Sequence, residues 1–474
     1  MLNGINIIPL LFLLPAGLCI LLILFRSRVL NAVSLLLYPV VYLAGTVKLY
    51  LYPEAGSPYF QSDPLNLFFM FVLGIVFFTV TLYHIRYLRH SKALIMRQTV
   101  HVILFLLFVV CMTGVLLSQH LGLLWVFVEA TTLISAPLIS YEKSKSSLEA
   151  TWKYIFICSI GISLAFVGII LLTLSGGPNN SLFFSDLYRN ASLFSLFWLK
   201  LSLPFILIGF GTKMGLAPVH AWLPDAHSEA PSPVSAMLSG TLLNTALFAI
   251  LKINKIMQLA GLGTYSHVLF LLMGFMSIFV SAVFILRTNN YKRMLAYSSI
   301  ENMGIITIAM ALGGAGAFAG FLHIAAHSFS KVLLFLTAGN ILHQYNTKEV
   351  SRVEGILRQD KMTGWLWIMG FIFIAGFPPG PGFISEILMV KSFLNMKYIV
   401  LMALFVLLLT FIIFGLARTI FKMSFGQGPV RPAGKKYAVL EYLPQIILII
   451  VLAVIGIFMP DIIYRLIQGA LGCI

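Results

Sequence analysis

Long apolar stretches dominate this chain and restrict how it can fold. Hydrophobic residues make up 60% of its 474 residues and charged residues only 10%, whereas soluble domains are apolar over only about half of their length. Backbone groups in lipid must be hydrogen-bonded within the protein, so apolar segments of about 17–25 residues cross a bilayer as helices. Fourteen such stretches occur, near residues 4–25, 30–52, 65–83, 100–118, 121–140, 152–175, 195–216, 232–252, 267–286, 294–313, 317–342, 363–388, 398–420 and 440–460. We predict an all-α membrane protein of about fourteen transmembrane helices, forming a single transmembrane domain over residues 1–474.

The Lys and Arg residues of the chain are distributed unevenly between the two sides of the predicted membrane. The net charge is +16, which in a soluble protein would suggest nucleic-acid binding. Here 21 Lys and Arg residues lie in alternate connections and 8 in the opposite set, while the remaining two are Lys213 and Lys331. Cytoplasmic connections carry the excess of Lys and Arg. We therefore expect a multi-pass protein of the cell (inner) membrane with both termini outside, and no nucleic-acid partner.

Motifs for redox chemistry are missing from the sequence. The four cysteines are Cys19, Cys111, Cys158 and Cys473, with no CxxC pair and no iron–sulfur spacing. No glycine-rich nucleotide-binding motif occurs. The chain is therefore expected to hold no cofactor or metal and to perform no catalysis of its own.

Two of the predicted helices contain residues that interrupt a helix. The first interruption runs from Gly209 through Lys213 to Pro218, and the second from Gly376 to Gly382, shortly before Glu386. Proline and glycine at membrane depth are tolerated where the backbone is buried in protein or lines a cavity. Paired broken helices are the sequence signature of inverted-repeat transporters. We expect two inverted five-helix repeats, over residues 100–253 and 267–422, in which helices 7 and 12 are broken.

Four ionisable side chains lie inside apolar stretches: Glu129, Lys213, Lys331 and Glu386. A charge at the bilayer centre costs roughly 2.5–3.5 kcal/mol even on insertion scales, and such residues commonly mark ion pathways. Glu129 is either a neutral carboxyl bonded to a neighbouring helix or a partner that stabilises charged Lys213. Lys213 can alternatively extend to an interface. Glu386 can serve either transport or a helix N-terminus.

A helical stripe accompanies Lys331. The spacing of His323, His327 and Lys331 places all three on one helix face. Paired histidines can bind a metal, but no HExxH pattern and no carboxylate partner accompany these two. Histidine titrates near neutral pH and suits a proton relay, whereas a structural polar stripe is the simpler interpretation.

Further polar residues are accessory candidates. His220, Asp225 and His227 fall in a connection of the basic set, where they either control access for ions or are simply solvated. Glu301 enters a predicted helix beyond Lys292 and Arg293, and can hold helices together.

At these segments the chain resembles the antiporter-like subunits shared by respiratory complex I, Mrp-type cation antiporters and membrane-bound hydrogenases. The resemblance covers roughly residues 60–425. It rests on Lys-Met-Gly-Leu-Ala-Pro-Val-His-Ala-Trp-Leu-Pro-Asp-Ala-His (213–227), Tyr-Lys-Arg-Met-Leu-Ala-Tyr-Ser-Ser (291–299), the His-x3-His-x3-Lys helix and Gly-Phe-Ile-Ser-Glu (382–386). The segments 129–137 and 298–304 are most similar to the F-type membrane component of hydrogenase-4 and its relatives in formate hydrogenlyase complexes.

The resemblance implies specific roles. Glu129 looks like the helix-5 glutamate, Lys213 the helix-7 lysine, Lys331 the central lysine and Glu386 the exit-site residue of helix 12. Many relatives carry a lysine in helix 8 where this chain has Asn244. An amide can hold a water but cannot carry the proton, so Lys252, two turns on, is a possible replacement.

The function implied is proton translocation by a relay of Glu129, Lys213, His323, His327, Lys331 and Glu386. The expected partners are other membrane subunits and a peripheral redox arm with NiFe hydrogenase and iron–sulfur subunits, in which electron transfer occurs. A subunit of an Mrp-type Na⁺/H⁺ antiporter or of a proton-pumping NADH:quinone oxidoreductase remains an alternative, as does a structural scaffold without transport.

Overall fold

The computed structural model describes residues 6–474 except 55, 92, 178–180 and 427–438. Contacts within the chain divide it into two compact units. The first unit contains residues 1–214, 241–266 and 469–474, and the second contains residues 215–240 and 267–468. Neither unit is a single continuous stretch, and residues 215–240, predicted within the first repeat half, belong to the second unit.

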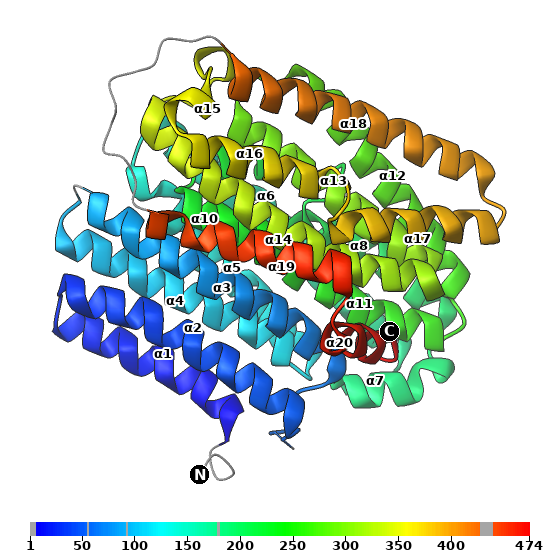
Figure 1. The fold of residues 1–474 in the computed structure, drawn as a ribbon. Coiled ribbons are helices and arrows are strands. Elements are labelled where there is room, and N and C mark those ends of the chain that lie inside the picture. Colours follow the sequence, from blue (N-terminus) through cyan, green and yellow to red (C-terminus); the bar gives the residue numbers. More distant parts are fainter. Residues whose placement is uncertain (1–5, 55, 92, 178–180, 427–438) are drawn as a thin grey trace. The chain divides into compact units, whose positions relative to one another are not determined.

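Long helices make up the first unit (Figure 1). They are α1 (Ile7–Leu24), α2 (Arg28–Leu51), α3 (Pro64–His90), α4 (Ile95–Leu117), α5 (Leu121–Ile139), α6 (Lys145–Ser175), the short α7 (Phe184–Asn190), α8 (Leu196–Met214) and α11 (Leu243–Leu259). Consecutive helices α4, α5 and α6 pack against one another, and α6 packs along α8.

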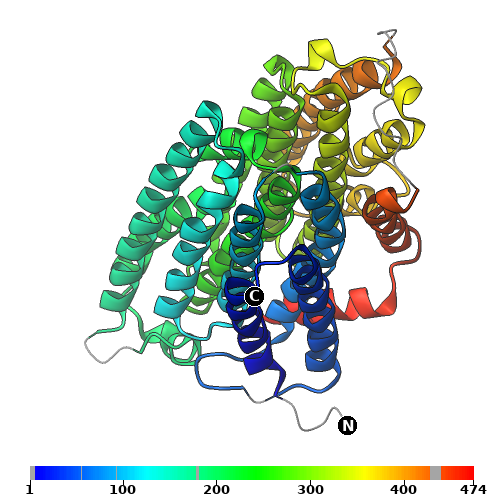
Figure 2. The ribbon, with the colours of Figure 1, turned by 90° about the vertical axis from the view of Figure 1, so that its left-hand side faces the viewer.

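The second unit is built from the remaining helices. They are α9 (Trp222–Glu229), α10 (Ser232–Met237), most of α12 (Gly263–Arg287), α13 (Tyr291–Leu312), α14 (Gly314–Tyr345), α15 (Ile356–Gln359), α16 (Lys361–Ile374), α17 (Pro381–Asn395), α18 (Ile399–Phe425), α19 (Leu443–Phe458) and most of α20 (Asp461–Leu471). Helix α14 is the centre of this unit, because α10, α13, α16, α17 and α19 all contact it. Figure 2 shows the same helices after a turn of 90° about the vertical axis.

The described residues are helical and include no β-strand beyond isolated bridges, as the sequence predicts. Twelve described helices are long and apolar enough to cross a membrane, or thirteen if α19 and α20, bent by 78°, form one span. The predicted stretch 363–388 is divided between α16, of 14 residues, and α17. The protein is therefore a multi-pass membrane protein.

Polar side chains determine where several helices begin. Asp63 accepts a hydrogen bond from the Asn66 backbone at the start of α3, and the Asn66 side chain accepts one from the Asp63 backbone. Ser144 caps α6 through a bond from the Ser147 backbone. Such caps satisfy backbone N–H groups that the first helical turn leaves without partners.

Both predicted interruptions are present. Helix α8 ends at Met214, and Gly215 follows with φ +82°. Helix α16 ends at Ile374, and Gly376 has φ +67°. Each glycine is followed three residues later by a proline, Pro218 or Pro379, whose preceding peptide bond is cis. Each break therefore starts with a left-handed residue that a side chain would strain.

Candidate functional site

Lys213 is a fully buried lysine in the last turn of α8. Its relative exposure is 0%, so its side chain does not extend to an interface. The Nζ atom donates hydrogen bonds to Thr132 Oγ1 at 2.8 Å and Tyr154 Oη at 2.6 Å. It also lies 4.7 Å from the centroid of the Tyr154 ring, within the range of a cation–π interaction. Side chains of α5 and α6 thus replace water around this ammonium.

Close packing of α6 on α8 brings Tyr154 and Lys213 together. A Cβ atom on Gly209 would lie 2.4 Å from the Ala165 backbone nitrogen, and one on Gly161 would lie 2.6 Å from Thr212 Cβ. Small residues allow membrane helices to approach this closely. Tyr154 lies two turns before Gly161 on the same face of α6, so this approach puts its hydroxyl within reach of α8.

Glu129 lies near Lys213 but does not form an ion pair with it. Its Oε1 atom accepts a hydrogen bond from Ser159 Oγ at 2.9 Å. Its charge contributes to the electrostatic environment of Lys213, yet no ion pair between the two is found among the described residues. The direct hydrogen-bond partners are hydroxyl groups, Ser159 for the Glu129 carboxylate and Thr132 and Tyr154 for the Lys213 ammonium, and stabilisation of Lys213 by Glu129 stays a prediction.

Asn244 lines a small cavity in the first unit. The cavity has a volume of about 10 Å³, and Phe69, Leu73, Leu116 and Thr241 also line it. A site of this size is at the lower limit for one water molecule. The lining includes no carboxylate, so a lysine at position 244 would have no acidic partner there.

Lys252 is held in an ion pair away from that cavity. Its Nζ atom lies 2.5 Å from Asp63 Oδ2, and the lysine side chain is 5% exposed. The Tyr188 hydroxyl donates to the Lys252 carbonyl oxygen at 3.1 Å. Asp63 also caps α3, so this pair attaches the middle of α11 to the start of α3.

Lys331 is the central buried cation of the second unit. It lies on α14 with 0% relative exposure. Its Nζ atom donates to the Leu295 carbonyl oxygen at 2.8 Å and also contacts Ser298 Oγ. Both partners belong to α13, and the Glu301 carboxylate on the same helix is within electrostatic range.

Hydrogen bonds continue from the Lys331 site to α17. Asn302 Nδ2 donates to the Ser298 carbonyl oxygen at 2.6 Å, and Asn302 Oδ1 lies 3.0 Å from His323 Nε2. The other ring nitrogen, His323 Nδ1, lies 2.7 Å from Ser385 Oγ. Ser385 immediately precedes Glu386. A connected set of polar groups therefore extends from Lys331 to the residue next to Glu386.

The surroundings of His323 suit both charge states of its ring. With Nδ2 of Asn302 donating to Ser298, Oδ1 is an acceptor, so His323 Nε2 must carry a proton. A neutral ring then accepts at Nδ1 from the Ser385 hydroxyl. A charged ring donates at Nδ1, and the Ser385 hydroxyl donates to the Gly382 carbonyl oxygen, 2.7 Å away. Rotation of one hydroxyl is enough to accommodate the change.

His327 and Glu301 lie beside this set rather than in it. His327 Nε2 is 3.3 Å from the Ser239 carbonyl oxygen, and the Ser239 hydroxyl is 2.8 Å from Ser299 Oγ. Glu301 is 4% exposed and lies within electrostatic range of Lys331 and Glu386. The helical spacing that predicts one face for His323, His327 and Lys331 is observed, but the two histidines have different partners.

Glu386 is positioned by the second helix break. A Cβ atom added to Gly376 would lie 2.5 Å from Glu386 Oε2, so the carboxylate packs directly against this glycine. Glu386 is the sixth residue of α17 and lies beyond its first turn. Its position therefore does not fit the alternative of an acidic residue capping the helix N-terminus.

The connection after Met214 is ordered by ion pairs. Asp225 contacts Arg293, and Glu229 lies 2.9 Å from Lys348. Lys292, one of the residues counted in the basic connections, is fully buried and donates to the Ala230 carbonyl oxygen at 2.6 Å. The sequence did not predict this burial, because a Lys-Arg pair at a helix start normally remains solvated.

The two histidines of this connection differ in burial. His227 is fully buried beside Trp222. His220 is partly exposed, and burial of its ring lowers the pKa of its imidazole below the ordinary value. A lowered pKa keeps the ring neutral near pH 7.

Several residues of the site were not predicted individually from the sequence. They are the hydroxyl and amide partners of the buried charges: Thr132, Tyr154, Ser159, Ser298, Asn302 and Ser385. Four of them, Thr132, Ser298, Asn302 and Ser385, lie in the segments that carry the family resemblance, which was the available signal. Over the described residues no three His, Cys, Asp or Glu side chains converge as metal ligands.

Comparison with known proteins agrees with this architecture. The family model described as "NADH:quinone oxidoreductase/Mrp antiporter, TM" matches residues 118–412. The hydrogenase-4 component F homolog of Methylacidiphilum infernorum is 32% identical over 88% of this chain and 89% of its own length. Hydrogenase-4 component B of Escherichia coli is 28% identical over 69% of this chain, which spans only 49% of that protein.

A solved structure has the same fold over nearly the whole chain. The membrane-bound sulfane sulfur reductase, an archaeal respiratory membrane complex, contains a chain with a TM-score of 0.88 and 23% identity, covering 98% of this chain and 97% of that one. Buried lysines, broken helices and these matches lead to one conclusion. The chain belongs to the transmembrane family of NADH:quinone oxidoreductases and Mrp antiporters, as an antiporter-like membrane subunit.

Proposed function

We propose that this chain is the proton-translocating subunit of a membrane-bound hydrogenase or complex I-like oxidoreductase. Electron transfer occurs in partner subunits, a NiFe hydrogenase and iron–sulfur proteins, and this chain is not itself catalytic. The observation that carries the proposal is the set of polar groups running from Lys331 through Ser298, Asn302 and His323 to Ser385. Hydrophobic helices have no structural need for such a buried network, which is costly unless fully satisfied.

In this proposal each half of the protein has its own protonatable lysine. Glu129 and Lys213 serve the first half, and Lys331 with His323 and His327 serves the second, with Glu386 toward the outside. Hydroxyl groups at Thr132, Tyr154 and Ser298 stabilise the charged lysines. Glu301 acts on Lys331 through its charge, while Asn244, Lys252, His220, Asp225 and His227 are accessory.

The proposed architecture has fourteen helices and two inverted five-helix repeats in the cell membrane, with both termini outside. The two breaks support the repeat, because each starts at a left-handed glycine followed three residues later by proline. These are Gly215 with Pro218, and Gly376 with Pro379. Broken helices at equivalent positions are where transporters of this kind handle ions.

Proton uptake by inverted membrane vesicles tests the proposal. The vesicles contain the complete complex, and electron transfer by the partner subunits is started with their reductant. Lys331→Ala and Lys213→Ala should each abolish the proton gradient while the complex still assembles. Lys391→Ala is the matched control, because this lysine is exposed. A normal gradient in both of the first two variants would reject the relay.

The same vesicles distinguish protons from sodium. A Na⁺/H⁺ antiporter requires Na⁺ and exchanges it for protons when no electron donor is present. We expect proton uptake to depend on the electron donor and to be independent of Na⁺. The subunits that copurify with the chain identify the redox partner, and a complex with NADH-oxidising subunits instead of a hydrogenase would favour the complex I alternative.

A further inference from the structure

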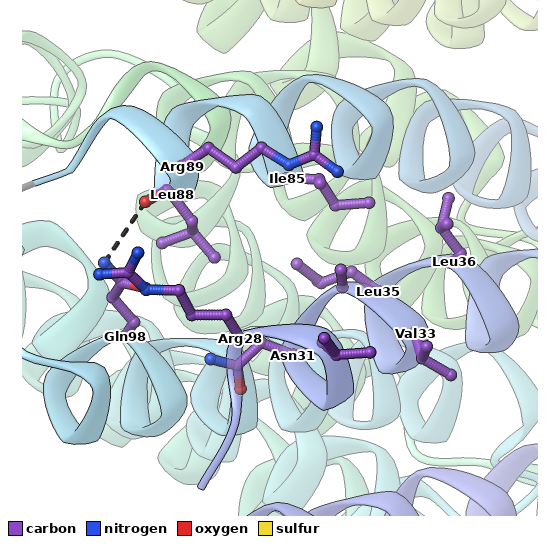
Figure 3. A pocket seen from close by; sticks show the side chains of 11 residues that line it. Arg28, Asn31, Val33, Leu35, Leu36, Ile85, Leu88, Arg89 and Gln98 are labelled. Atoms are coloured by element: carbon purple, nitrogen blue, oxygen red, sulfur yellow. Dashed lines mark hydrogen bonds between the residues drawn. The ribbon is translucent and has the colours of Figure 1, made fainter.

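A cavity of about 320 Å³ lies at one end of the first unit, and Lys213 is not among the residues that line it. Helix α2 contributes residues 28–36 to its lining, α3 contributes residues 85–89, and α4 contributes Gln98. Figure 3 shows the polar side chains of Arg28, Asn31 and Gln98 toward one end of the view and the apolar Val33 and Leu36 toward the other. The part near Arg28, Asn31 and Gln98 is polar and the part along Val33 and Leu36 is apolar, while the Arg89 side chain extends along α3 above Ile85 rather than toward Arg28 (Figure 3).

Two arginines provide positive charge that nothing in the described protein neutralises. Arg28 starts α2, and Arg89 is the next-to-last residue of α3. Both are exposed, and neither forms a hydrogen bond or an ion pair within the part of the chain that the structure describes. Helices α2 and α3 are consecutive and packed together, so both arginines lie at the same end of the pair.

A buried amide in the same cavity lacks hydrogen-bond partners. Asn31 is 3% exposed, and neither its oxygen nor its nitrogen is bonded to any described residue. An unsatisfied buried polar group costs about 1–3 kcal/mol, so such a group often indicates a missing ligand. The neighbouring Gln98 differs from Asn31, because its amide nitrogen Nε2 already donates hydrogen bonds to the Leu88 and Ala93 carbonyl oxygens (Figure 3).

The apolar part of the cavity continues along α2 and is open to the lipid side. Leu35 is fully buried, whereas Val33 and Leu36 are 46% and 41% exposed. Leu36 lies eight residues beyond Arg28, or about 12 Å along the helix axis. The cavity therefore extends from the helix end, where the arginines lie, toward the hydrocarbon interior.

We propose that this cavity binds an anionic phospholipid, with its phosphate at Arg28 and Asn31, an acyl chain along Val33, Leu35 and Leu36, and Arg89 adding positive charge from the neighbouring helix. Guanidinium groups bind phosphate oxygens by charge-assisted hydrogen bonds, and the Asn31 amide nitrogen donates another. Both arginines belong to the connections rich in Lys and Arg, the side on which basic pockets between helices meet anionic lipids. A helix of a partner subunit in this cavity would leave the charges of Arg28 and Arg89 and the amide of Asn31 without partners, unless that helix carried acidic groups next to them.

Native mass spectrometry of the complete complex in detergent tests the proposal, with phosphatidylglycerol as the probe and phosphatidylcholine as the uncharged comparison. Arg28→Gln with Arg89→Gln should lower phosphatidylglycerol binding about thirtyfold, since each arginine near an anionic headgroup contributes about a factor of five. The control is Arg358→Gln with Arg418→Gln, two exposed arginines from the same set of connections, which should bind the lipid normally. Equal binding by both double variants, or equal binding of phosphatidylcholine by the wild type, would overturn the proposal.

Two further variants distinguish a lipid from other occupants. Val33→Asp puts a charge on the exposed apolar part, so it should weaken phosphatidylglycerol binding without changing that of inorganic phosphate. Unchanged lipid binding in this variant would mean that only a phosphate is held. A photoreactive residue at Leu36 should capture lipid, and capture of a neighbouring polypeptide instead would assign the cavity to a protein partner.

Discussion

His323 is the residue of the proposed relay whose contacts accommodate both protonation states of its side chain. It joins Asn302 on α13 to Ser385 on α17, and both of its charge states can be satisfied there. A structural histidine needs only one such state. A proton relay requires this ring to gain and lose a proton, whereas a structural polar stripe does not. A substitution that removes the titratable ring therefore distinguishes the two.

We expect His323→Gln to slow electron-driven proton uptake about a hundredfold, the lower end of what a positioned acid–base group contributes. Glutamine retains hydrogen-bonding capacity but does not titrate, so complex assembly should be preserved. His343→Gln is the control, because this histidine is exposed in the last turn of the same helix. Uptake at the normal rate in His323→Gln would show that the ring has only a structural role.

Gly376 combines two restrictions, a left-handed backbone and contact with Glu386. Gly376→Ala should cost about 1–2 kcal/mol for the backbone conformation and should also displace the carboxylate, whose oxygen lies 2.5 Å from the new Cβ. Gly261→Ala separates the two effects, because Gly261 has φ +76° and no neighbour within 4 Å of its Cβ position. Both variants should lose thermal stability, but only Gly376→Ala should also lose proton uptake.

At the scale of elements, the contact between α6 and α8 determines which groups surround the ammonium of Lys213. The two backbones approach closely at Gly161 and Gly209, and Tyr154 of α6 is thereby brought to Lys213 of α8. A change in the distance between these helices alters the surroundings of the ammonium without altering the lysine. Small residues here consequently have a functional effect through packing.

Gly209→Ala should destabilise the first unit by about 1–3 kcal/mol, the usual cost of overpacking, because the added Cβ lies 2.4 Å from the Ala165 backbone. Thermal unfolding in detergent measures this loss, and Gly17→Ala, whose Cβ has nothing within 4 Å, is the control. Tyr154→Phe removes the hydroxyl without moving the helices. If Gly209→Ala acts by separating Tyr154 from Lys213, both variants should slow proton uptake. The double variant should then be only slightly slower than either single variant.

Sequence reasoning succeeded where one residue type determines the local structure. Glycine and proline predict the breaks after Met214 and Ile374, and an isolated charge in an apolar stretch predicts the burial of Lys213 and Lys331. It failed for partners such as Thr132 and Ser385, because a hydroxyl in a membrane helix commonly bonds its own helix backbone and only packing determines whether it also meets a charge. For the same reason the sequence did not predict the hydroxyl groups that bond to Glu129 and Lys213.

At the scale of the whole molecule, the excess of Lys and Arg predicts the orientation in the membrane. Alkaline phosphatase fused after Ile474 should be active, because both termini are expected outside. Green fluorescent protein inserted after Asn346, in a connection of the basic set, should fluoresce. The reverse pattern, with an inactive phosphatase and no fluorescence, would mean that the protein has the opposite orientation.

The last residues of the chain return to the first unit. Residues 469–474 belong to it, Lys255 Nζ donates to the Cys473 carbonyl oxygen at 2.8 Å, and a Cβ on Gly469 would touch Pro64. During synthesis, α1–α8 and α11 are inserted long before these residues leave the ribosome. The ribosome must therefore finish the second unit before the first unit can acquire its final contacts. Until then Lys255 and the start of α3 lack these contacts and can be bound by other proteins.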